Sequence, residues 1–194
     1  MTLPNKLTIV RILLTAVIAF LLFMPGWLSK TAALAAFLIA SLTDWLDGYL
    51  ARRWHQTSPM GALLDPIADK VLVLGTFSAF AQLRVVPWWM VGLIALREIL
   101  VTGARLVAAR RHIILSAEIE GKQKAVSQFV AAIVVLVVVI VQEAQGKAPM
   151  PIQHRITMDL AVLGCMGLAT ALTLTSGASF FWAHRTALRA SFRA

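Results

Sequence analysis

Six long apolar runs dominate the sequence, and polar, proline or glycine residues separate them. They cover roughly residues 8–26, 31–53, 61–83, 87–110, 122–142 and 157–182. A helix needs about 20 residues to cross the hydrocarbon core of a bilayer. Because lipid cannot satisfy an unpaired backbone group, each run is predicted to be helical. With 59% hydrophobic residues in 194, the chain is expected to be an all-α, polytopic bundle of six transmembrane helices, forming a single domain over residues 1–194.

The first run is interpreted as a retained span rather than a signal peptide. Lys6 and Arg11 accompany it, as basic residues accompany a signal peptide, but the stretch is long and no small-residue cleavage site precedes Trp27. Cys165, the single cysteine, lies in an apolar run. An internal disulfide and a cysteine-based metal site are therefore excluded.

Basic residues orient the predicted bundle. Most lie on the side that holds both termini and the segments 54–60 and 110–122: Lys6, Arg11, Arg52, Arg53, Arg105, Arg110, Arg111, Lys122, Lys124, Arg185, Arg189 and Arg193. The other side has Lys30, Arg84, Lys147 and Arg155. The positive-inside rule places the richer side, with both termini, in the cytoplasm. Since the net charge of +9 forms no separate basic domain, anionic lipids and substrates explain it better than nucleic acid.

Four aspartates form the main candidate site: Asp44, Asp47, Asp65 and Asp69. Spacings of three and four put each pair on one face of its helix, and the short turn between the two runs makes those helices antiparallel neighbours. Converging carboxylates repel one another unless cations compensate them. Oxygen ligands without His or Cys favour Mg²⁺ or Mn²⁺. The alternative is structural salt bridges to Arg52, Arg53 and Lys70.

The pattern around these aspartates resembles the signature of the CDP-alcohol phosphatidyltransferase family. It reads Asp44-x-x-Asp47-Gly48-x-x-Ala51-Arg52, then eight residues, then Gly61-x-x-x-Asp65-x-x-x-Asp69, and it matches at every fixed position. Further segments are similar to the phosphatidylglycerophosphate synthases of that family: Leu3-Pro4-Asn5-Lys6-Leu7-Thr8-x-x-Arg11, Thr43 to Gly48, Leu64 to Lys70, Arg97-Glu98-Ile99 and Gly121-Lys122-x-Lys124. Ala125 departs from this likeness, because a threonine often stands there.

The resemblance implies an activity and assigns roles. Asp44, Asp47, Asp65 and Asp69 would hold Mg²⁺ or Mn²⁺, and Asp69 would act as general base while a phosphatidyl group passes from CDP-diacylglycerol to an alcohol. The residues that the resemblance implies would contact the CDP-lipid are Asn5, Thr8, Gly48, Ala51, Arg52, Ser58 and Gly61. The expected acceptor, glycerol 3-phosphate, needs cations around its phosphate, and the candidates are Arg105, Arg110, Lys122 and Lys124. A homodimer in a bacterial inner membrane, with a cytoplasmic active site, is also expected.

Several alternatives stay open at the level of sequence. Ser58 before Pro59 is also a typical helix N-cap, and Arg52 and Arg110 are also explained by lipid phosphates and the positive-inside rule. Arg97 and Glu98 lie deep in the fourth run and must face protein, either to bind ligand or to brace the bundle. Inositol phosphate or phosphatidylglycerol could replace the acceptor. A cation transporter is disfavoured because the aspartates gather at one interface.

Overall fold

The computed structural model is an all-helical bundle in the part of the chain that it describes. The backbone is described for residues 3–54, 59–110, 119–146 and 151–185, and the side chains for 9–43, 70–109, 121–146 and 151–185. The helices are α1 (Leu3–Phe23), α2 (Trp27–Trp54), α3 (Pro59–Gln82), α4 (Trp88–Arg110), α5 (Ile119–Ala144) and α6 (Ile152–Ala183). Each coincides with one of the apolar runs, which confirms the predicted helices.

Several helices begin earlier than their apolar runs. α1 starts at Leu3 and α6 at Ile152, about five residues before the predicted spans. An apolar run marks only the length of helix that suits lipid, whereas helical hydrogen bonding continues into polar flanks. α3 begins at Pro59, as the Ser58-Pro59 pair predicted, although Ser58 itself lies outside the described residues.

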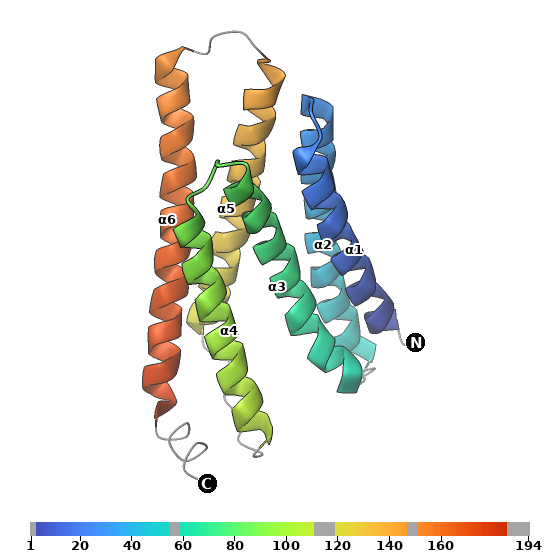
Figure 1. Ribbon diagram of the computed structural model, residues 1–194. Helices are drawn as coiled ribbons and strands as arrows, with labels where there is room; N and C mark the ends of the chain where they lie inside the picture. Colours follow the sequence, from blue (N-terminus) through green and yellow to red (C-terminus); the bar gives the residue numbers. More distant parts are fainter. Residues whose placement is uncertain (1–2, 55–58, 111–118, 147–150, 186–194) are drawn as a thin grey trace.

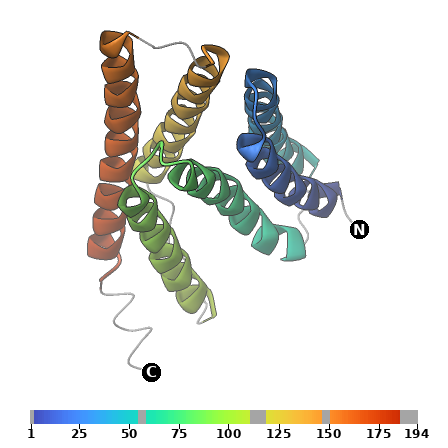
Figure 2. The ribbon, with the colours of Figure 1, turned by 45° about the horizontal axis from the view of Figure 1, so that its top comes forward.

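The bundle has two groups of helices with α3 between them. Figure 1 shows α1 and α2 on one side, α4, α5 and α6 on the other, and α3 between the two groups, and the turned view in Figure 2 agrees. α1 packs against both α2 and α3, while α5 packs against α2 and α6. The start of α1 and the end of α6 lie at one end of the bundle, together with the ends of α2 and α4. This arrangement places residues 44–54 and 59–69 at the same end as the N-terminus.

Polarity is arranged inside out relative to a water-soluble protein. Large apolar side chains are exposed around the bundle, among them Leu13, Phe20, Ile99 and Leu160. Polar side chains are buried in its interior: Arg11, Thr15, Lys30, Thr76, Glu98, Gln128, Thr170, Thr173 and Ser176. Such an apolar surface would be unstable in water but suits a bilayer. Trp27, Trp88 and Trp182 are exposed at helix ends, where interfacial tryptophans belong.

Length and composition identify two helices within the described residues that can cross a membrane, Gly121–Ala144 and Ile152–Ala183. Shorter apolar helical stretches cover Ile9–Phe23, Trp27–Thr43 and Lys70–Gln82. α4 carries Arg97 and Glu98 near its middle, which lowers its hydropathy. Together with the apolar surface, these two helices indicate a helical membrane protein, and of the six predicted spans two meet this criterion within the described residues.

The far end of the bundle is held by hydrogen bonds around the α1–α2 turn. The Nζ atom of Lys30 donates to the carbonyl of Leu22, in the last turn of α1, and to that of Met24, just after it, where carbonyls lack partners within the helix. The Gly26 amide donates to Oε1 of Glu143 in α5 at 2.6 Å. Gly26 has a φ of 99°, a left-handed conformation that favours glycine. These contacts fix α1, α2 and α5 relative to one another.

Candidate active site

The helical backbone supports the predicted pairing of the aspartates within each helix. Positions 44 and 47 lie within α2 and positions 65 and 69 within α3, so each pair shares a helix face. Their side chains lie outside those that the structure describes, as do the side chains of the other predicted residues at this end: Asn5, Thr8, Gly48, Ala51, Arg52, Ser58, Gly61 and Arg110. The described side chains contain no cluster of three metal-ligating residues. The predicted metal site lies outside these side chains.

Arg11 is buried in α1 beside this region. Its side chain is 1% exposed, although the sequence suggested only a charge near the cytoplasmic surface. One turn later, the Thr15 hydroxyl donates to the Arg11 carbonyl at 2.9 Å, and the Thr15 methyl packs directly on Gly75 of α3. Side chains on a helix lean toward its N-terminus. Arg11 therefore lies at the end of the bundle that carries the four aspartate positions.

An ion network links α4 to α5. Oε1 of Glu98, which is 4% exposed, accepts a hydrogen bond from Nζ of Lys124. The same oxygen lies 3.3 Å from Nη1 of Arg97. A carboxylate at this depth requires such partners, because its transfer out of water is costly. The sequence prediction that Arg97 and Glu98 face the protein interior is confirmed.

Arg97 extends the network to α6. Its Nη2 donates to the Ser176 hydroxyl at 2.8 Å. The adjacent Gly177 provides the space, because a Cβ atom there would lie 2.9 Å from Cγ of Arg97 and 3.3 Å from its Nε. Ser176, Arg97, Glu98 and Lys124 thus form a continuous polar chain from α6 through α4 to α5.

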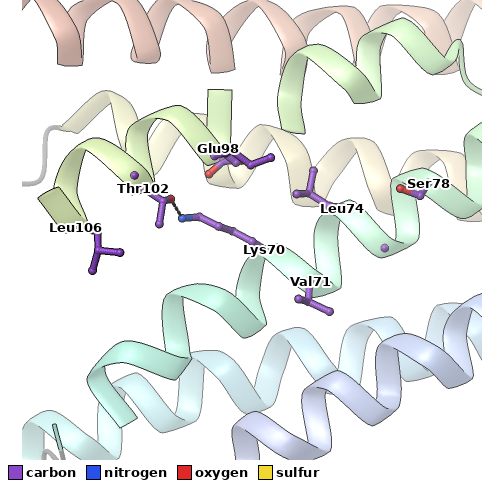
Figure 3. Close-up of a pocket in the computed structure, with 10 residues that line it drawn as sticks. Lys70, Val71, Leu74, Ser78, Glu98, Thr102 and Leu106 are labelled. Carbon is purple, nitrogen blue, oxygen red and sulfur yellow. Dashed lines mark hydrogen bonds between the residues drawn. The ribbon is translucent and has the colours of Figure 1, made fainter. Parts of the chain in front are cut away.

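A second polar contact connects α3 to α4 at the edge of an open groove. Figure 3 shows Lys70 reaching from α3 to Thr102 of α4, with Glu98 on the same wall; Nζ of Lys70 donates to the Thr102 hydroxyl. The groove has a volume of about 600 Å³, and most of its lining is apolar, including Val71, Leu74, Ile99 and Leu106. Its shape and lining suit a hydrocarbon chain. Lys70 follows Asp69 directly in the sequence.

A small cavity lies behind Glu98, between α3, α4 and α5. Its volume is about 20 Å³, and its polar lining comes from Lys70, Glu98, Lys124 and Gln128. A cavity of this size can hold about one water molecule. Gln128 Nε2 also donates to the Thr173 hydroxyl at 2.8 Å, so the polar interior continues into α6.

The described candidates for binding the acceptor phosphate occupy different environments. Lys124 is mostly buried and bound to Glu98. Arg105 is exposed and places its guanidinium 5.2 Å from the centre of the Phe180 ring. Lys122 is exposed and, two residues before Lys124, projects from another face of α5. The structure thus brings Lys124 into the polar interior, but neither Arg105 nor Lys122.

Several residues of the polar interior were missed by the sequence analysis: Thr102, Gln128, Thr173, Ser176 and Gly177. Their signal is periodicity, because Thr102 is four residues after Glu98, and Gln128 is four after Lys124. In α6, Thr170, Thr173 and Ser176 recur every three residues in an apolar run. Small and polar residues at such spacing commonly mark helix–helix contacts in membranes.

Comparisons with known proteins bear on the chemistry of this region. Residues 1–162 match the family model for CDP-alcohol phosphatidyltransferase. The chain is 33% identical to the CDP-diacylglycerol–glycerol-3-phosphate 3-phosphatidyltransferase of Bacillus subtilis, over 97% of this chain and 98% of that protein. It is 35% identical to the protein of the same name from Escherichia coli, over 66% of this chain and 72% of that one. With the Pseudomonas fluorescens protein of that name it shares 49% identity, over 38% and 37% respectively.

Proposed function

The chain belongs to the CDP-alcohol phosphatidyltransferase family, as its motif predicted, and on that premise we propose that it transfers the phosphatidyl group of CDP-diacylglycerol to glycerol 3-phosphate. The products are phosphatidylglycerophosphate and CMP. The observation that carries this proposal is the similarity over nearly the whole length to a protein named for that reaction. The four aspartates at family spacing support the chemistry.

The donor set suits a hard divalent cation. Carboxylates spaced three and four apart on continuous helices provide oxygen ligands, and Asp44, Asp47, Asp65 and Asp69 would hold Mg²⁺ or Mn²⁺. When bound, the metal supplies charge neutralisation for the diphosphate. Asp69 takes the proton of the acceptor hydroxyl. The hydroxyl oxygen then forms a bond to the lipid-side phosphorus, while the bond from that phosphorus to the CMP oxygen breaks and CMP leaves.

Other residues bind and orient the two substrates. Asn5, Thr8, Gly48, Ala51, Arg52, Ser58 and Gly61 contact the CDP-lipid, and Arg105, Arg110, Lys122 and Lys124 are the cations for the acceptor phosphate. Of the acceptor set, Lys124 has the strongest support, because it lies in the polar interior. The groove beside Lys70 suits one acyl chain of the donor, since its lining is apolar.

The proposal extends to the setting of the enzyme. It works as a single six-span domain over residues 1–194 in a bacterial inner membrane, among membrane lipids and as a homodimer. Both termini and the aspartates face the cytoplasm, where a water-soluble acceptor meets a lipid donor. The excess of basic residues at that end of the bundle supports this orientation.

A CMP-release assay tests the proposed function. Purified protein in Mg²⁺ with CDP-diacylglycerol should release CMP with glycerol 3-phosphate, and much less with inositol phosphate or phosphatidylglycerol. Asp44→Ala should abolish release, because it removes an anionic ligand. Asp159→Ala is the matched control, since Asp159 is exposed on α6. Turnover only with another acceptor would refute the assignment of glycerol 3-phosphate, and near-normal turnover of Asp44→Ala would refute the metal site.

A further inference from the structure

Glu98 is a buried carboxylate with cationic side chains beside it. Its Oε1 accepts from Lys124 of α5 and lies beside Nη1 of Arg97. Lys70 of α3 lines the same small cavity. Among the described side chains in this part of the interior, Glu98 thus contacts two cations directly and shares a cavity with a third.

Packing alone does not explain a charged group in this position. Burying ions costs free energy, and well-packed apolar residues often replace a buried ion pair without loss of stability. α4 and α6 have another connection through Arg97 and Ser176, and α5 and α6 through Gln128 and Thr173. Glu98 adds something else, because it defines the position of the Lys124 ammonium group.

A lysine needs such a restraint more than other cations do. Its ammonium lies at the end of a flexible four-carbon stem, and its three donors allow it to bind a carboxylate and a phosphate oxygen together. Glu98 is itself oriented by Arg97. The Arg97 side chain packs against Gly177 and donates a hydrogen bond to the Ser176 hydroxyl. Through the contacts Ser176–Arg97–Glu98–Lys124, α6 and α4 therefore fix where the ammonium group of Lys124 lies.

We propose that Glu98 is a positioning residue that holds Lys124 in place to bind the phosphate of the acceptor alcohol. This inference rests on the proposed function, because it requires a phosphorylated acceptor. Glu98 does not touch the reacting atoms. It sets the affinity for the acceptor, whereas the headgroup of the CDP-lipid is bound by other residues, at the end of the bundle that carries the aspartate positions.

Glu98→Gln tests the inference, because it retains the size and a hydrogen-bond acceptor but removes the charge. Hydrogen bonds to charged groups contribute enough that KM for glycerol 3-phosphate should rise about 10- to 100-fold. KM for CDP-diacylglycerol should stay within about twofold, because Glu98 is one polar member of the groove assigned to an acyl chain, whose apolar side chains would bind that chain. Glu98→Asp, which keeps the charge on a shorter stem, should give an intermediate KM for the acceptor.

Two further variants separate positioning from folding. Thr173→Val removes a neighbouring buried hydrogen bond between α5 and α6 without touching Glu98, so it should leave both KM values unchanged. In a Lys124→Met background, Glu98→Gln should add little to the KM for the acceptor, since coupled residues are not additive.

The outcomes distinguish the two proposals. If the unmodified enzyme releases no CMP with glycerol 3-phosphate, the proposed function fails, and the inference fails with it. If it does release CMP but Glu98→Gln raises both KM values, neither, or only that of the lipid, the inference alone is overturned. A Glu98→Gln chain that does not fold would also overturn it, by showing that Glu98 holds the bundle together.

Discussion

Gly75→Ala should destabilise the contact between α1 and α3. A Cβ atom on Gly75 would lie 2.6 Å from Cγ2 of Thr15, about 1 Å closer than carbon atoms normally approach. Thr15 cannot simply turn away, because its hydroxyl is bonded to the Arg11 carbonyl at 2.9 Å. Overpacking of this kind costs about 1–3 kcal/mol, and we expect the free energy of unfolding to fall by that amount.

Unfolding by SDS in mixed micelles, followed by tryptophan fluorescence, measures this loss. Thr15→Ser removes Cγ2 but keeps the hydroxyl, so it should recover most of the loss in the Gly75→Ala background. In the unmodified chain the same change should cost about 0.8 kcal/mol for the lost methyl group. Gly92→Ala is the matched control, because nothing lies within 4 Å of its added Cβ. An undiminished stability of Gly75→Ala, or no recovery with Thr15→Ser, would refute the reasoning.

Three other changes have defined outcomes. Asp69→Asn should bind CDP-diacylglycerol yet release CMP about 10²–10⁴-fold more slowly at any Mg²⁺ concentration, because an amide cannot accept the hydroxyl proton; full recovery at high Mg²⁺ would leave Asp69 as a ligand only. A double-mutant cycle of Gln128→Leu and Thr173→Val, measured by SDS unfolding, should give a coupling of about 0.6 kcal/mol, and zero coupling would contradict the bond. Chelation by EDTA should abolish CMP release and Mg²⁺ should restore it, whereas turnover that persists in EDTA would argue against the metal.

The helices and the family were predictable from sequence because both depend on local patterns. Each apolar run must become a helix in lipid, whatever its neighbours are, and the six runs coincide with α1 to α6. The aspartate motif has defined spacing within two helices, so its chemistry was recognisable without a fold. Even the inward direction of Arg97 and Glu98 followed from their depth in an apolar run.

The partners of the interior charges could not be derived in the same way. Lys124 lies 26 residues from Glu98, and Ser176 lies 79 residues from Arg97, so their contacts depend on which helices pack together. Similar basic residues illustrate the point, since Lys124 binds Glu98 while Lys122 is exposed. The sequence by itself determined which segments are helical and which charges are costly in lipid. Only the tertiary structure decided how those charges are compensated, because an ion pair forms between atoms that helix packing, and not chain order, brings together.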